Sequence, residues 1–116
     1  MQVWSLASGS AGNAFLLRAD DTLVLVDCGL PLRALTERLA QLGLHPCQLS
    51  AVLVTHEHTD HLGGVPGLLK RHPVPLYATG GTLAAAAGRL PPRATCHQVV
   101  AGQPFQIGAF TVRPFA

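Results

Sequence analysis

Charged residues are scarce in this chain of 116 residues: they make up 12% of it, about half the usual quarter. Aromatic residues are scarce too, at 5%, whereas apolar residues reach 48%. An intrinsically disordered chain needs low hydrophobicity and a high net charge, so this composition excludes one. The length suffices for one domain with a usable core, which must be built from Leu, Val and Ala.

Other absences limit the compartment and the partners. Three cysteines, an odd number without a Cys-x-x-Cys pair, do not suit a disulfide framework. The first ten residues lack the basic region of a signal peptide, and no apolar run approaches the 18 residues of a membrane helix. The eight Lys and Arg residues are scattered, so no basic stripe by itself indicates nucleic-acid binding. We therefore expect a cytoplasmic protein with no membrane partner.

Hydrophobic periodicity predicts that strands come first as a hairpin and then alternate with helices. Short alternating or continuous apolar runs predict strands over residues 2–6, 13–18, 22–26, 51–54, 75–78, 96–100 and 105–113, the last turning at Gly108. Spacings of three and four predict helices over residues 31–42, 64–71 and 81–88, the last capped by Thr82. This order indicates an α+β domain whose mixed sheet is covered by helices on at least one face.

Three imidazoles and two carboxylates lie within residues 55–61 (Thr-His-Glu-His-Thr-Asp-His), directly after an apolar strand. At strand-like spacing His56 and His58 point the same way, so both can bind one metal ion. Asp60 and His61, at the turn into a helix, can face a second ion. Two ions about 3.5–4 Å apart can hold a bridging hydroxide and polarise a phosphoryl or carbonyl oxygen. The alternative interpretation is a solvated histidine-rich turn without a function.

This segment and residues 25–29 (Leu-Val-Asp-Cys-Gly) upstream resemble the two motifs of the metallo-β-lactamase superfamily of hydrolases, in the same order and spacing. Residues 8–13 (Ser-Gly-Ser-Ala-Gly-Asn) resemble the opening of its YycJ/WalJ-like branch, whose members are described as exonucleases. The resemblance covers essentially the whole chain. It implies an αββα sandwich, of which residues 1–116 would be an incomplete, N-terminal half.

The resemblance also implies a role for each motif residue. His56 and His58 would bind the first metal ion, and Asp60 and His61 the second. Asp60 would also be the catalytic residue that orients the attacking water. Asp27 would lie behind the ligands and hydrogen-bond their loop; taken alone, it is explained as well by a capping or turn role. Two zinc ions are expected, although manganese or iron suits the same ligands.

The chain departs from the family pattern after His61. In the family, a third histidine for the first ion follows a strand like residues 109–114, and a bridging Asp and one more His follow later. Here only His72 and His97 come after the motif, and no Asp or Glu comes after Asp60. We therefore expect an incomplete ligand set in this chain, and little or no catalysis by the isolated chain.

Three functions remain open at this point. The first is a phosphodiesterase or exonuclease that, in its complete form, attacks nucleic acid with metal-bound hydroxide. The second is a hydrolase of a thioester, lactone or small ester on the same scaffold. The third is a non-catalytic metal-binding fragment. In each case a half-sandwich would expose an apolar face, which the missing C-terminal half or self-association would cover.

The remaining candidate residues have ordinary explanations. His45 is expected to be exposed in a loop, His72 to end a helix, and His97 to lie in an alternating strand with a small chance of approaching the site. Cys28 is expected to be a small buried side chain, because a nucleophilic thiol needs a partner histidine and a depressed pKa. Residues 9–12 either cradle a phosphate through backbone N–H groups or permit close packing beside the metal loop.

Overall fold

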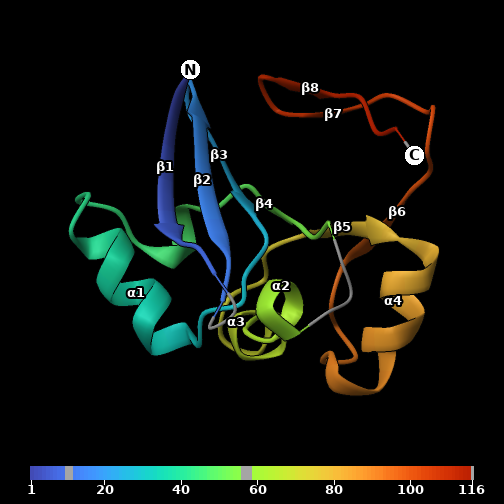
Figure 1. Ribbon diagram of the computed structural model, residues 1–116, viewed down its shortest axis with the longest axis horizontal. Coiled ribbons are helices and arrows are strands. Elements are labelled where there is room, and N and C mark those ends of the chain that lie inside the picture. Colours follow the sequence, from blue (N-terminus) through green and yellow to red (C-terminus); the bar gives the residue numbers. More distant parts are fainter. Residues whose placement is uncertain (10–11, 56–58, 116) are drawn as a thin grey trace.

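The computed structural model describes residues 1–9, 12–55 and 59–115, with the side chains of residues 59 and 60 left out. Its centre is a six-stranded sheet with the strand order β1-β2-β3-β4-β5-β6 (Figure 1). The strands are β1 (Gln2–Ala7), β2 (Ala14–Ala19), β3 (Thr22–Val26), β4 (Ala51–Leu53), β5 (Leu76–Thr79) and β6 (Cys96–Val99).

The sheet is mixed. β1, β2 and β3 form an antiparallel meander, whereas β3, β4, β5 and β6 run parallel to one another. The continuous apolar run of β3 lies inside the sheet, where Val24 pairs with Ala51 and Val26 with Leu53. Because parallel strands end at one edge, the segments that follow β3 and β4 meet there.

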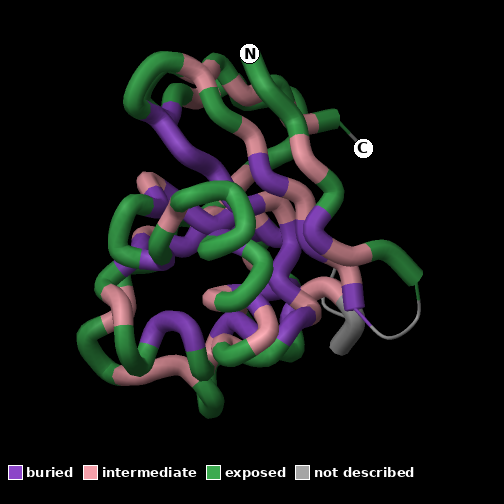
Figure 2. The backbone as a smooth tube through the Cα atoms, turned by 90° about the vertical axis from the view of Figure 1, so that its left-hand side faces the viewer, coloured by how far each residue is buried: buried purple, intermediate pink, exposed green. Residues whose placement is uncertain are grey.

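Helices cover one face of this sheet. They are α1 (Leu32–Ala40), α2 (Thr59–Leu62), α3 (Val65–Arg71) and α4 (Gly80–Ala86), with short 3-10 turns η1 (Pro46–Gln48) and η2 (Ala87–Arg89). In α1 the fully buried Leu35 and Leu39 are four residues apart, so they share the face that packs on the sheet. They join Leu16, Leu25 and Leu76 in the main core. Figure 2 shows these buried stretches along the strands and on one side of the helices.

A small hairpin lies on the other face of the sheet. It consists of β7 (Phe105–Ile107) and β8 (Phe110–Val112), and Ile107 packs with Val24 and Ala51. The Ala109 N–H donates a 2.9 Å hydrogen bond to Oγ1 of Thr22, which fixes the hairpin turn to the β2–β3 turn. Gly108 has φ +54°, and a side chain there would clash with Thr22. Glycine is therefore required at this contact.

The predicted α+β class and element order are confirmed, and residues 105–113 turn at Gly108 as expected. One capping prediction is wrong. Thr79, not Thr82, caps α4, because Oγ1 of Thr79 accepts the Thr82 N–H at 3.3 Å. Thr82 is instead buried within α4. Among the residues described, no helix is long and apolar enough to cross a membrane.

Candidate metal centre

Asp27 lies directly after β3, at the edge where the parallel strands end. Its backbone has φ +63°, a left-handed conformation that Asp tolerates better than most residues, and its N–H bonds to the Leu53 carbonyl at 2.7 Å. Only 4% of the residue is exposed. A buried carboxylate needs hydrogen-bond donors around it, so its partners define what this residue does.

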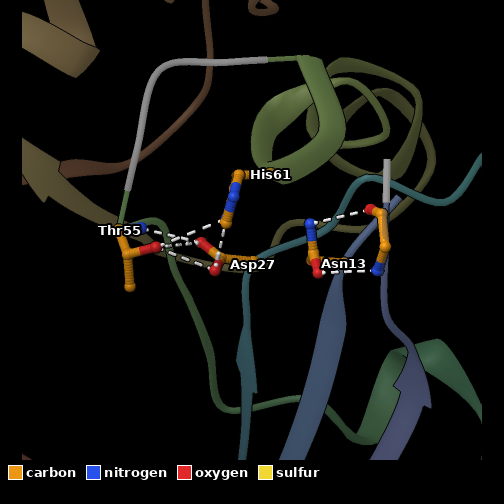
Figure 3. Close-up of polar contacts among 5 residues, drawn as sticks. Asn13, Asp27, Thr55 and His61 are labelled. Carbon is orange, nitrogen blue, oxygen red and sulfur yellow. Dashed lines mark hydrogen bonds and ion pairs between the residues drawn. The ribbon is translucent and has the colours of Figure 1, made fainter. Parts of the chain in front are cut away.

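Thr55, directly after β4, supplies two of those donors (Figure 3). Its backbone N–H lies 2.7 Å from Oδ1 of Asp27, and its Oγ1 lies 2.9 Å from Oδ1 and 2.8 Å from Oδ2. The two contacts fix both carboxylate oxygens in place. Asp27 therefore joins the ends of β3 and β4 and has a defined orientation.

His61, in α2, makes the third contact with the carboxylate. Its Nδ1 lies 2.8 Å from Oδ2 of Asp27 (Figure 3). Because a carboxylate only accepts hydrogen bonds, Nδ1 carries the proton and the lone pair of the neutral ring lies on Nε2. Histidines that bind metal ions usually donate their other ring nitrogen to such a carboxylate. The contact therefore prepares His61 to bind a metal ion through Nε2.

Backbone contacts hold α2 against the loop that follows Asp27. The Cys28 N–H donates to the His61 carbonyl at 2.7 Å, and the Gly64 N–H donates to the Cys28 carbonyl at 2.7 Å. A Cβ at Gly64 would lie 1.7 Å from the Leu30 carbonyl oxygen. The chain can approach so closely only because residue 64 is glycine. The His61–Asp27 contact thus rests on a rigid backbone arrangement.

The glycine-rich loop before β2 packs against the same region. The Gly29 N–H donates to the Asn13 carbonyl at 2.9 Å, and a Cβ on Gly12 would lie 3.1 Å from the Gly29 carbonyl carbon. The Asn13 amide also bonds both backbone groups of Gly9, at 3.2 Å each (Figure 3). Of the two explanations for residues 9–12, these contacts support close packing beside the candidate metal loop.

Comparison with known proteins identifies the family. The sequence profile of the Metallo-beta-lactamase superfamily matches residues 7–104. The chain belongs to the metallo-β-lactamase superfamily. It is 44% identical over 77 residues to the "Exodeoxyribonuclease WalJ" of Streptococcus pneumoniae serotype 2, and 40% identical over 77 residues to the "Exodeoxyribonuclease YycJ" of Bacillus anthracis. Among solved structures it resembles "Rm3 metallo-beta-lactamase", with a TM-score of 0.77 and 22% identity.

The metallo-β-lactamase relatives are much longer than the matched part. Each exonuclease alignment covers 66% of this chain and 29% of the relative, and the Rm3 superposition covers 94% of this chain and 46% of that structure. The predicted fold is thereby confirmed as the metallo-β-lactamase fold. Members of this superfamily generally bind divalent metal ions, typically zinc.

The predicted ligands lie only partly within the described residues. His56 and His58 lie outside them, and the side chain of Asp60, in α2, is also outside. Among the side chains that the structure does describe, no three His, Cys, Asp or Glu residues gather as a metal site. The geometry brings together Asp27 and His61. The ligand roles of the four motif residues stay predictions.

Sequence analysis missed two residues that support this site, Thr55 and Gly64. Thr55 orients Asp27 through its backbone N–H and hydroxyl groups, and Gly64 allows the Leu30 carbonyl to come close. Position offered the one available signal, because Thr55 directly precedes the histidine motif and Gly64 closely follows it. Neither contact follows from spacing along the chain.

The other histidines and Cys28 are placed away from catalysis. His45 is exposed and its Nδ1 accepts the Cys47 N–H at 3.1 Å, which caps η1. His72 ends α3 as expected, and its ring meets that of His45 edge to face at 5.6 Å. Cys28 is fully buried, and this burial raises the pKa of its thiol to about 12. A thiol that stays protonated at neutral pH does not act as a nucleophile.

Proposed function

We propose that the complete protein is a metal-dependent hydrolase that cleaves phosphodiester bonds in nucleic acid as an exonuclease. Membership in the superfamily and the similarity to two proteins named exodeoxyribonucleases support this function. One observation in the structure carries it: the 2.8 Å contact between Nδ1 of His61 and Oδ2 of Asp27. It leaves the ring oriented for metal binding through Nε2.

The motif residues divide into ligands and supporting groups in this proposal. His56 and His58 would hold one divalent ion, and Asp60 and His61 the other. When bound, the two ions supply a nucleophile at neutral pH and neutralise charge on the phosphoryl oxygens. We expect zinc, with manganese or iron as alternatives.

The protein's own side chains then orient and hold protons. Asp27 keeps the proton of His61 on Nδ1, and Thr55 fixes the carboxylate through its N–H and hydroxyl groups. Asp60 would orient the attacking water. Correct orientation of a nucleophile removes much of the entropic cost of the reaction.

We propose further that residues 1–116 form the N-terminal half of a larger metallo-β-lactamase domain. The matches that cover 29% and 46% of longer relatives support this division. So does the lack of any Asp or Glu after Asp60, since the family places a bridging carboxylate later in the chain. The additional half, or self-association, would cover the sheet face on which β7 and β8 lie. The isolated chain would have little activity.

We assign the protein to the cytoplasm. Cys28, Cys47 and Cys96 are all free thiols. A reducing compartment keeps such thiols unpaired.

Hydrolysis assays on the full-length protein that carries residues 1–116 test this function. Single-stranded DNA should be degraded after loading with Zn²⁺ or Mn²⁺, and Asp60→Ala should abolish degradation. The His45→Ala variant, a histidine change outside the site, should keep full activity. Preferential cleavage of a thioester or lactone would favour the small-ester hydrolase instead. Metal binding with no turnover of either substrate would favour a non-catalytic metal-binding protein.

A further inference from the structure

Three aromatic rings gather where β5, β6 and β7 meet (Figure 1). The Tyr77 ring stacks on the His97 ring with centroids 4.6 Å apart and planes 19° apart. It also stacks on the Phe105 ring, at 5.3 Å and 7°. Tyr77 and Phe105 are half-buried, whereas His97 is exposed. We call Tyr77, His97 and Phe105 the ring cluster; it is a set of near-parallel π-faces that reaches solvent.

A hollow of about 330 Å³ lies beside the ring cluster. The side-chain amides of Gln98, Gln103 and Gln106 also line it. Each amide offers both donors and acceptors of hydrogen bonds. None of the described lining residues is Asp, Glu, Lys or Arg, so the hollow suits a flat polar group that carries no charge. A nucleobase has this chemistry, with a π-face and an edge of donors and acceptors.

A second hollow connects this region with the candidate metal centre. Its volume is about 290 Å³, and Thr55, Thr79 and Val99 are among its lining residues. Tyr77 pairs with His97, and two residues further along the same strands Thr79 pairs with Val99. Residues two apart in a strand share a face and lie about 6.6 Å apart. The two hollows are therefore neighbours on one face of the sheet, and the second reaches Thr55.

A cationic side chain also lines the second hollow, that of Arg113. A nucleic-acid strand alternates flat bases with anionic phosphates. An arginine beside Thr55 and an uncharged aromatic hollow next to it reproduce that alternation. Base–aromatic stacking combined with cations along the backbone is the usual chemistry of proteins that bind single strands.

We propose that the ring cluster binds an unpaired nucleobase of a single-stranded nucleic acid whose backbone passes Arg113 toward Thr55. This inference rests on the proposed function, because that function makes nucleic acid the substrate. The base stacks on the exposed ring of His97, and the glutamine amides bond to its edge. A duplex does not fit this role, since its bases are already stacked and paired.

Binding of two DNA tetramers to the 116-residue chain tests the inference. One is tetrathymidylate, and the other is a tetramer of abasic sites with the same number of phosphates. EDTA is present, so no cleavage occurs. Dissociation constants come from the anisotropy of a labelled strand, and the NMR signals of Tyr77, the single tyrosine of the chain, report stacking directly.

The wild-type chain should bind tetrathymidylate at least about fivefold more tightly than the abasic strand. His97→Ala should remove that preference, and His97→Phe should restore it. The matched control is His45→Ala, because His45 is also an exposed histidine in contact with another ring. Arg113→Gln should weaken the binding of both tetramers by a similar factor, since it acts on phosphate.

Equal affinity for the two tetramers, no saturable binding, or an equal loss for both in His97→Ala would overturn the inference. Unshifted Tyr77 signals would overturn it as well. Failure of the proposed function looks different. The full-length, metal-loaded protein would then leave DNA intact, while the base-dependent binding of the metal-free chain would persist.

Discussion

His61 and Asp27 are 34 positions apart in the sequence, yet Nδ1 of the histidine lies 2.8 Å from Oδ2 of the carboxylate. The parallel sheet creates this contact, because β3 ends directly before Asp27 and β4 leads into the segment that carries His61. The backbone bond from the Cys28 N–H to the His61 carbonyl holds the two segments together. The histidine is thus oriented by the fold itself.

Thr55 should stabilise the site before any metal ion binds. The Thr55→Val variant removes the hydroxyl donor but keeps the backbone N–H, so the buried Asp27 loses one partner. We expect a loss of about 1–3 kcal/mol in the free energy of unfolding. Thr55→Ser should recover most of it. Urea denaturation of the metal-free chain measures both values, and equal stability of the valine and serine variants would contradict this role.

Two glycines three positions apart allow a matched test of the packing. A Cβ on Gly64 would lie 1.7 Å from the Leu30 carbonyl oxygen, whereas one on Gly67 would meet nothing within 4 Å. Gly64→Ala should cost about 1–3 kcal/mol or more through overpacking. Gly67→Ala, within α3, should stabilise by roughly 0.5–1 kcal/mol. Similar urea midpoints for the two variants would show that the chain does not pack closely at residue 64.

The pair formed by His45 and His72 should respond to pH. Burial lowers the pKa of His72 below its ordinary value, and the neighbouring His45 lowers the pKa further. Because the folded pKa is lowered, the neutral ring stabilises the fold above the unfolded pKa of 6.5, and this contribution is lost as pH falls through the folded pKa.

Replacement of His45 by alanine should raise the pKa of His72 toward its ordinary value. NMR titration of the ring protons measures this change. His97→Ala is the control, because His97 contacts Tyr77 rather than His72. A His72 pKa that does not change in His45→Ala would contradict the coupling.

The architecture followed from the sequence because its signals are local. The apolar run of residues 23–26 predicted an interior strand, and β3 lies inside the sheet. The cap of α4 was misassigned to Thr82 because Thr79 and Thr82 both precede an alanine-rich helix. Spacing alone does not show which of two threonines leaves the helical conformation.

The candidate site was predictable only in part. The motif pattern pointed to Asp27 and His61 through a family resemblance, and the structure brings them together. The contributions of Thr55 and Gly64 depend on contacts between segments that are distant in sequence, which periodicity does not encode. The stacking of Tyr77 on Phe105 likewise requires the β7–β8 hairpin to fold back over the sheet.

The central claim is that Asp27 orients His61 for metal binding, and calorimetric titration of Zn²⁺ into Asp27→Asn tests it most directly. Asn can present its NH₂ group to Nδ1, which would move the ring proton to Nε2 and block the ligand nitrogen. The matched control is Asp21→Asn, an exposed acid in the β2–β3 turn. We predict zinc affinity about 10–100-fold weaker in Asp27→Asn and unchanged in Asp21→Asn. Equal zinc affinity in Asp27→Asn and the wild type would contradict the claim.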